Sequence, residues 1–363
     1  WAHGSHFIES VPMGMGKTQY IDLRGDWFEP NFPQLIKALG GALPDLAYTP
    51  PPVKPPAPGV VRRSPYKGLS AFQEADAGDF FGRAAAISEL IAKTGERVKA
   101  ERGRLLAVIG ASGSGKSSVV MAGLLPRLKK GDALAGSESW LYAPPITPGN
   151  TPIRALTRGL SRALPEKSFG AIEDDLWRPN GLGLANLAYT VDQRMILFID
   201  QFEEVFMPSV SPDERDQMIN LLVQAANEPR GSLTVLLTLR ADYYDRPMND
   251  RELGELISRN QYSLLPMTLT ELREAVENPA LLPDTGLAFE PGLVGEIVFD
   301  LREAKDKMAL AGALPLLQFT LQQLYDKRDT SQPVHVLTMS AYADLGGVSG
   351  AISQHAESVF AGL

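Results

Sequence analysis

The feature that most constrains this chain is a glycine-rich loop between a short apolar run and a helix-forming segment, in residues 104–123. Residues 105–109, LLAVI, are apolar throughout, as expected for a central parallel strand that helices cover on both faces. The octapeptide GASGSGKS at 110–117 follows and fits G-x-x-x-x-G-K-[ST] at every fixed position. A strand, this loop and a helix in that order predict a phosphate-binding site rather than a glycine-rich surface turn.

The residue types in this loop suit phosphate for separate reasons. The glycines allow backbone angles that turn successive N–H groups toward phosphate oxygens, and the helix that starts here adds the positive end of its dipole. Lys116 supplies a point charge for the β- and γ-phosphates, and the Ser117 hydroxyl is placed to ligate Mg²⁺. We therefore expect the following residues to bind the nucleotide: Gly110, Ser112, Gly113, Ser114, Gly115, Lys116, Ser117 and Ser118.

A second apolar run ends in a carboxylate. Residues 195–199, MILFI, precede Asp200, which we expect to bind Mg²⁺ beside Ser117, directly or through water, at the end of a buried strand. Glu203 and Glu204 follow, and one of them could hold and polarise the attacking water. Glu203 is the first choice. For Glu204, a helix cap or a solvated helix start is the alternative.

A further strand, predicted at 233–239, ends at Arg240. An arginine at the carboxyl edge of a strand beside the phosphate loop can sense the γ-phosphate of a nucleotide. The alternative is an ion pair with Asp242 or Asp245. We expect Arg240 to act in catalysis together with Lys116 and one of the two glutamates.

The periodicity of the chain places these motifs in one sheet. Strands are predicted at 105–109, 140–143, 195–199, 233–239 and 262–265. Helices are predicted between and after them, at 84–99, 153–164, 212–227 and 270–277. The alternation predicts an α/β fold with a doubly wound, parallel, five-stranded sheet. Residues 168–180 show no consistent period and are expected to form a surface excursion.

From Glu290 onward the pattern is helical, with helices predicted at 292–302 and 314–325. Pro315 falls in the first turn of the second helix, where a missing N–H costs nothing. A short extended piece at 334–337 and a partly helical stretch at 340–360 follow.

The composition indicates how the chain divides into domains. The 363 residues, 44% of them apolar, can bury a large core and form more than one domain. Eight prolines between Pro44 and Pro65 predict a semi-rigid linker. We expect the chain to divide into five parts. These are an N-terminal segment at 1–43, a linker at 44–65, a nucleotide-binding domain at 66–285, a helical subdomain at 286–330 and the start of a further subdomain at 331–363.

Charge and cysteine content exclude several kinds of function. The chain has no cysteine, which rules out thiolate catalysis and favours a reducing cytoplasm. A net charge of −8 argues against general binding to nucleic acid or to an anionic membrane. No apolar run approaches the ~18 residues of a membrane span.

Taken in order, the strings PYKGL, FFGR, GASGSGKS, FIDQFEE, LTLRADYYDR, GALPLLQF and DLGGVSGAISQHAE resemble a bacterial signal-transduction NTPase of the STAND class, in the branch called novel STAND. The resemblance covers Pro65 to the C-terminus and implies a P-loop NTPase whose 331–363 segment begins a winged-helix subdomain. It implies that Phe81, Gly82 and Arg83 lie against adenine, that Pro315 touches adenine and that Arg240 is the sensor. Ala84 stands where many relatives have a glutamate. The resemblance also implies that the sensor strand lies between the other two motif strands.

The string QYIDLRGDWFEPNFPQLIKAL, in residues 19–39, resembles the last strand and helix of bacterial TIR domains, which are signalling modules and often cleave NAD. The catalytic glutamate of that family lies upstream of such a tail, so no residue here matches it. The alternative is a leader strand and helix of the next domain.

Together these resemblances imply a slow ATP hydrolase that acts as a switch. ADP would hold the module closed, and ATP with Mg²⁺ would open it for self-association, so that TIR domains meet and cleave NAD, as in antiphage defence by abortive infection. A C-terminal sensor outside these residues would bind the activating ligand. Two alternatives stay open: a regulator that binds DNA through its winged helix, and a motor or transporter ATPase with the same sheet.

Overall fold

The computed structural model describes residues 62–348 apart from 230, 308–312 and 332, together with Gly350. The TIR-like segment 1–43, nearly all of the linker 44–65 and residues 351–363 lie outside the described residues. Among the described residues, no helix combines the length and the apolar character needed to cross a membrane.

A parallel five-stranded sheet organises the larger part of the chain, as the sequence predicted. Its strands are β1 (Leu105–Gly110), β2 (Leu141–Tyr142), β3 (Met195–Ile199), β4 (Leu233–Arg240) and β5 (Gln261–Ser263). Their order is β2-β3-β4-β1-β5, so the strand that ends at Arg240 lies between the phosphate-loop strand and the strand before Asp200. In this register Gly110 pairs with Arg240, which brings the two loops to the same edge of the sheet.

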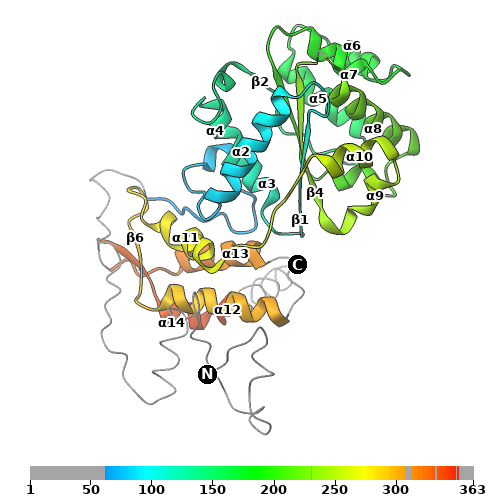
Figure 1. The fold of residues 1–363 in the computed structure, drawn as a ribbon. Coiled ribbons are helices and arrows are strands. Elements are labelled where there is room, and N and C mark those ends of the chain that lie inside the picture. Colours follow the sequence, from blue (N-terminus) through cyan, green and yellow to red (C-terminus); the bar gives the residue numbers. More distant parts are fainter. Residues whose placement is uncertain (1–61, 230, 308–312, 332, 349, 351–363) are drawn as a thin grey trace, which may run out of the picture.

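Helices cover both faces of this sheet (Figure 1). Successive strand residues point to opposite faces, so Leu105 and Ala107 enter one core while Leu106 and Val108 enter the other. The first core is covered by α5 (Pro152–Ala163), α6 (Phe169–Leu176), α7 (Gly183–Tyr189), α8 (Pro212–Asn227) and α10 (Arg251–Arg259). The second core is covered by α2 (Ala84–Lys99) and by the helical segment made of α3 (Lys116–Ser118), a π-helical stretch (Val119–Leu124) and α4 (Leu125–Lys129). The short α9 (Asp245–Met248) follows β4. Because both faces of the sheet are buried, the strands β1 and β3 are apolar throughout rather than alternating.

Residues 168–180, in which the sequence showed no consistent period, contain the helix α6. The Ser168 hydroxyl accepts a hydrogen bond from the Ala171 N–H and caps the helix, and Ile172 and Leu176 are fully buried. Two apolar residues four apart are too few to reveal a period, and tertiary packing supplies the rest of the stability.

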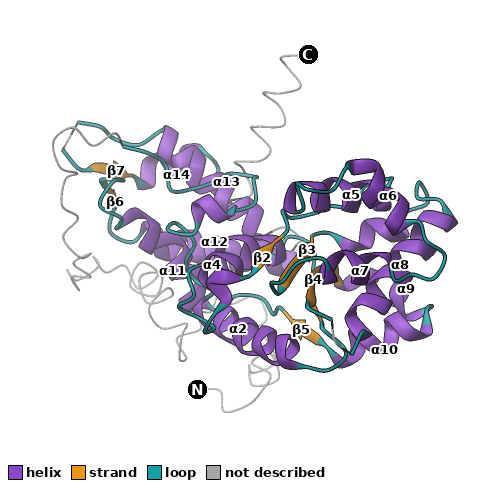
Figure 2. Cartoon of the chain, turned by 90° about the horizontal axis from the view of Figure 1, so that it is seen from above, coloured by secondary structure: helices purple, strands orange, loops and turns teal. Residues whose placement is uncertain are grey.

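A second, mainly helical unit follows the sheet. It contains α11 (Leu269–Ala280), α12 (Leu293–Lys307), α13 (Ala313–Asp326) and α14 (Met339–Asp344), with the parallel strand pair β6 (Leu287–Phe289) and β7 (His335–Leu337). The strand β6 was not predicted, because three residues carry too little pattern. Figures 1 and 2 show this unit beside the sheet, and we call residues 73–268 the sheet lobe and residues 269–348 the helical lobe.

The helical lobe has a core of its own. Residues from α11, α12, α13, β6, β7 and α14 form one cluster, which extends to Val348. The helix α11, which the sequence placed in the domain ending at residue 285, therefore packs with the helical lobe. Residues 335–348 share that core as well, and the boundaries drawn at 285 and 330 stay predictions.

Candidate nucleotide-binding site

The phosphate loop has the backbone that its glycines permit. Gly113 and Gly115 have φ of +69° and +89°, the left-handed region that favours glycine. Gly110 is required for a different reason: a Cβ there would lie 2.8 Å from Ser114 Oγ and 3.0 Å from the Leu264 carbonyl oxygen. The loop thus packs tightly against the end of β5 and leads directly into the helical segment that begins at Lys116.

Lys116 is folded back over this loop. Its Nζ donates to the carbonyl oxygens of Gly110 (3.0 Å) and Ala111 (2.9 Å), and the residue is only 8% exposed. Burial lowers the pKa of this ammonium, and the nearby Glu203 carboxylate opposes the shift. A buried cation whose hydrogen-bond acceptors are neutral carbonyls is poorly compensated, and a phosphate would supply the missing negative charge.

Three oxygen-bearing side chains meet at the end of β3. The Asp200 carboxylate accepts hydrogen bonds on Oδ1 from the Ser117 hydroxyl (2.7 Å) and from the Thr238 hydroxyl (2.6 Å). The structure therefore brings together the two residues that the sequence assigned to Mg²⁺. Oxygen ligands of this kind are those that Mg²⁺ prefers.

Thr238 was missed by the sequence reasoning. Its Oγ1 also accepts a hydrogen bond from the Gln201 N–H (2.8 Å), and Gln201 has φ +56°, the one left-handed non-glycine residue among those described. The hydroxyl thus supports the tight turn after Asp200 while it orients the carboxylate. A polar residue inside the otherwise apolar run LLTL of β4 was the available signal.

The two glutamates after β3 have different surroundings. Glu203 is 6% exposed, accepts a hydrogen bond from the Arg240 N–H (3.2 Å) and has its pKa raised by burial, an effect that Lys116 partly opposes. Glu204 instead accepts a hydrogen bond from the Gly149 N–H (2.8 Å) and so fixes the loop after β2. Only Glu203 is held at the edge where β4 and the phosphate loop meet.

Arg240 forms an ion pair with Asp242, which the sequence analysis gave as the alternative to a sensor role. Its guanidinium binds Asp242 through two hydrogen bonds, of 3.0 and 2.6 Å, and lies 5.2 Å from the centre of the Tyr243 ring. The hydrogen bond to Asp242 raises the pKa of Arg240. The side chain is 37% exposed, so it has room to exchange this partner for another anion.

The segment before α2 packs against both the loop and the helical lobe. Gly82 has φ +79°, and a Cβ there would lie 2.2 Å from the Glu271 carbonyl oxygen of α11. The buried Arg83 guanidinium donates to the carbonyl oxygens of Ser114 (3.0 Å) and Leu265 (2.9 Å), and burial lowers its pKa. Arg83 thus braces the phosphate loop.

A pocket lies between the phosphate loop and α13. Its lining joins Phe81, Lys116, Ser117, Ser118 and Pro315, which are as far as 234 residues apart in the sequence. The other lining residues are Gly68, Leu69, Ser70, Ala71, Phe72, Asp79, Phe80, Arg83, Gly113, Gly115, Met267, Ala275, Leu314, Leu317 and Gln318. Most of these are apolar or aromatic, as a nucleobase requires.

Of the residues predicted to bind the nucleotide, Gly82, Gly110, Ser112 and Ser114 do not line this pocket. Ser112 and Ser114 line a second pocket on the other side of the phosphate loop, against Leu264, Leu272 and Leu301. Its other lining residues are Arg83, Ile109, Gly110, Ala111, Gly113, Ala241, Ser263, Leu265, Pro266, Met267, Thr268, Leu269, Ala313 and Leu314. The Ser114 hydroxyl is buried and has no hydrogen-bond partner among the described residues.

These features fit a nucleotide phosphate with a bound cation. The unpaired Ser114 hydroxyl and the poorly compensated Lys116 ammonium suit an anion, and the oxygens of Ser117 and Asp200 suit Mg²⁺. The loop after β1, the carboxylate after β3 and the parallel sheet between them define a P-loop NTPase.

Comparison with known proteins identifies the family. The chain belongs to the family described as Novel STAND NTPase 1, whose family model matches residues 65–363. The sequence matches no curated protein.

Solved structures share the fold at low sequence identity. The Aeropyrum pernix ORC2 protein in its ADPNP-ADP complexes has a TM-score of 0.51 and 14% identity, covering 75% of this chain and 68% of that chain. Its ADP form has a TM-score of 0.50 and 15% identity, covering 68% and 64%. Cdc6p from Pyrobaculum aerophilum has a TM-score of 0.46 and 15% identity, with 68% of this chain covered. This chain spans 61% of the length of that Cdc6p chain. At such identities the likeness concerns the fold alone.

Proposed function

We propose that this chain is a switch that binds ADP or ATP between its two lobes, hydrolyses ATP slowly and changes the placement of the lobes accordingly. The observation that carries the proposal is the shared pocket: Pro315 and Gln318 of α13 line it together with Lys116 and Ser117 of the phosphate loop. A ligand shifts an equilibrium between two placements only by contacts that differ between them. The contacts of the γ-phosphate, which ATP has and ADP lacks, would supply this difference.

The chain's own side chains have defined parts in this proposal. Lys116 would exchange its two carbonyl partners for phosphate oxygens, and Arg240 would exchange Asp242 for the γ-phosphate. Glu203 would orient the attacking water, because Glu204 is engaged by Gly149. Ser117 and Asp200 would hold Mg²⁺, which when bound neutralises phosphate charge.

Adenine is the base that the surroundings favour. The pocket offers Phe81, Pro315 and Leu317 to a base, and the STAND membership supports the sequence assignment of the segment before α2 to adenine. The Aeropyrum ORC2 structures, which share the fold, are described as ADPNP-ADP and ADP forms.

For the output, we infer that activation makes the chain self-associate and brings TIR domains together, so that NAD is cleaved in the cytoplasm during antiphage defence. The inference is supported by the resemblance of residues 19–39 to a TIR tail and by the STAND membership of residues 65–363. The linker at 44–65 would join effector and switch. In a form that includes a complete TIR domain, we expect NAD consumption with ATP and not with ADP. Equal NAD consumption with either nucleotide, or no consumption with both, would contradict the proposed control of a TIR effector by the nucleotide switch.

The decisive experiment for the switch is to denature the purified chain and identify the released nucleotide by chromatography. We expect nearly one ADP per chain, and none from Lys116→Ala, because that variant loses the phosphate charge partner. Steady-state ATP hydrolysis should be slow. An empty site that binds and turns over ATP freely would contradict the switch and favour a motor ATPase.

A further inference from the structure

Residues 62–72, which we call the strap, run between the two lobes before the chain enters α2. Tyr66 of the strap is 2% exposed and is the member of the helical-lobe core that lies outside residues 276–348. Its hydroxyl donates to the Val276 carbonyl oxygen of α11 (2.9 Å). The first half of the strap is therefore built into the helical lobe.

The second half of the strap is built into the sheet lobe. The Phe72 N–H donates to the Ser118 hydroxyl of the phosphate-loop helix (3.2 Å), and its ring lies 5.3 Å from the Phe80 ring. Phe80 packs on the core beneath α2. Between these two anchored ends, Gly68 to Phe72 line the nucleotide pocket.

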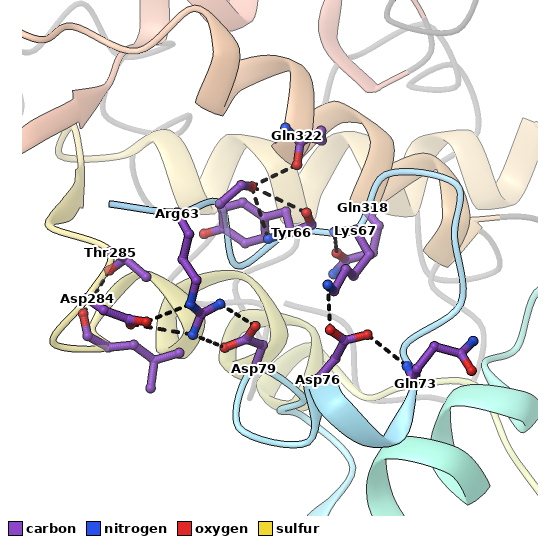
Figure 3. Close-up of polar contacts among 12 residues, drawn as sticks. Arg63, Tyr66, Lys67, Gln73, Asp76, Asp79, Asp284, Thr285, Gln318 and Gln322 are labelled. Atoms are coloured by element: carbon purple, nitrogen blue, oxygen red, sulfur yellow. Dashed lines mark hydrogen bonds and ion pairs between the residues drawn. The ribbon is translucent and has the colours of Figure 1, made fainter. Parts of the chain in front are cut away.

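One arginine of the strap holds both lobes at once (Figure 3). The Arg63 guanidinium donates to both carboxylate oxygens of Asp79 (2.5 and 2.7 Å) and, through Nε, to Asp284 (2.6 Å). Asp79 directly precedes Phe80 of the sheet-lobe side and its side chain is 6% exposed. Asp284 follows α11 in a turn that the buried Thr285 hydroxyl fixes by donating to the Ala280 carbonyl oxygen (2.6 Å).

The strap also lies along α13, the helix that reaches the nucleotide pocket. The Ser64 hydroxyl donates to Gln322 (2.7 Å), and the Lys67 N–H donates to Gln318 (3.2 Å), one turn earlier on the same helix. Gln318 itself lines the pocket. A displacement of α13 from the phosphate loop therefore pulls on the strap directly.

We propose that Arg63 is a clasp that couples the nucleotide-dependent placement of the lobes to the chain N-terminal to the strap. The inference rests on the proposed nucleotide switch and names its mechanical link. Because Asp79 and Asp284 belong to different lobes, separation of the lobes must break one of the two charge pairs. Whichever pair breaks, the strap shifts at Arg63, which lies near the C-terminal end of the predicted linker at 44–65.

A static brace is the competing explanation, in which the same contacts hold the lobes together in every state. The two explanations differ in a measurable way. Loss of a brace lowers the melting temperature and leaves lobe spacing and nucleotide release unchanged, whereas loss of a clasp changes both.

The chain has no cysteine, so two labels can be introduced directly. Glu101→Cys on the sheet lobe and Lys327→Cys on the helical lobe are exposed positions for a distance measurement by electron spin resonance. The test variant is Asp284→Asn, which breaks the clasp on the helical side and leaves Arg63 paired with Asp79. The matched control is Glu252→Gln, an equal charge change at an exposed position of α10.

For Asp284→Asn we expect a longer label distance without nucleotide and release of fluorescent ADP that is about three- to tenfold faster, given the size of such charge pairs. Tryptic cleavage after Arg62 or Arg63, followed by mass spectrometry, should also accelerate. Glu252→Gln should match the wild type in all three measurements.

Label distance and ADP release equal to the wild type in Asp284→Asn would overturn the clasp, whether or not the melting temperature falls. A wild-type chain that binds no ADP would instead contradict the proposed function. The distance and proteolysis measurements, which need no nucleotide, then still decide whether Arg63 holds the lobes. Asp284 is partly exposed, so its substitution is not expected to prevent folding.

Discussion

Glu203 and Lys116 are buried groups of opposite charge at the edge where the phosphate loop meets β4, and burial acts on both. It raises the pKa of Glu203 and lowers that of Lys116, so each is more easily neutralised than in water. Groups with shifted pKa values at a binding site are candidates for catalysis: Lys116 lines the pocket, and Glu203 is close enough to affect the pKa of Lys116.

Glu203→Gln should reduce ATP hydrolysis by about two to four orders of magnitude while nucleotide binding persists, since it removes the base and keeps an oxygen for the Arg240 N–H. Glu204→Gln is the matched control, because Glu204 serves the loop at Gly149. Single-turnover hydrolysis and ADP binding measure both effects. A larger loss in Glu204→Gln would transfer the role of base to that residue.

The same substitution has a pH signature. Because the folded-state pKa of Glu203 lies above the ordinary value of 4.5, its protonation stabilises the fold at low pH, and that stabilisation is lost as pH rises through the raised pKa. Glu203→Gln should therefore melt at a higher temperature than the wild type at neutral pH. The difference should shrink as pH falls toward 4.5, which thermal melts across this range would check.

Thr238 is the residue at this site that the sequence did not reveal. Thr238→Val removes the donor to Asp200 and the acceptor for the Gln201 N–H, so we expect a loss of about 1 to 3 kcal/mol of unfolding free energy and weaker Mg²⁺-dependent ATP binding. Thr234→Val is the matched control on the same strand, because the buried Thr234 hydroxyl has no partner among the described residues. Chemical denaturation and Mg²⁺ titration would measure the two effects. Equal losses in both variants would mean that burial of the threonine, and not its bonds, matters.

For single residues, the sequence predicted those positions that a motif defines by its spacing. Asp200 and Ser117 follow from spacing, and the structure places them in contact. No motif names Thr238, because its role depends on β4 lying beside β3; the family resemblance implied that order, but no local pattern encodes it.

At the scale of elements, the glycine before Arg83 determines how closely α11 approaches the sheet lobe. A Cβ at Gly82 would meet the Glu271 carbonyl oxygen at 2.2 Å, and φ is +79°. We expect Gly82→Ala to lower the unfolding free energy by about 1 to 3 kcal/mol and to weaken ADP binding, because α11 must move away. Gly78→Ala, where no atom lies within 4 Å of the added Cβ, should leave both unchanged. Unaltered binding in Gly82→Ala would show that α11 can shift without disturbing the site.

Most elements were predictable where a period extended over several turns or a strand was buried on both faces. The helix α8 begins and ends where its pattern indicated, and β3 matches its apolar run. The helix α6 and the strand β6 were missed because eight and three residues, respectively, give little periodicity. Their stability comes from packing with distant segments.

At the scale of the whole molecule, the two lobes have separate apolar cores and are joined by the strap and by residues 264–268. Separate cores allow separate unfolding, since each buries its own surface. Without nucleotide, we therefore expect two overlapping calorimetric transitions, one for each lobe.

Saturating ADP should raise both transitions and merge them, because the pocket is lined by both lobes. A ligand at a hundred times its dissociation constant stabilises the state that binds it by about 2.7 kcal/mol. The helical-lobe transition can move to a higher temperature only if the ligand also contacts the helical lobe. Pro315, Leu317 and Gln318 are the contacts through which this would occur. Lys116→Ala should show two transitions at all ADP concentrations used. If ADP raised the sheet-lobe transition alone, the nucleotide would contact one lobe only, and the helical lobe could not respond to its exchange.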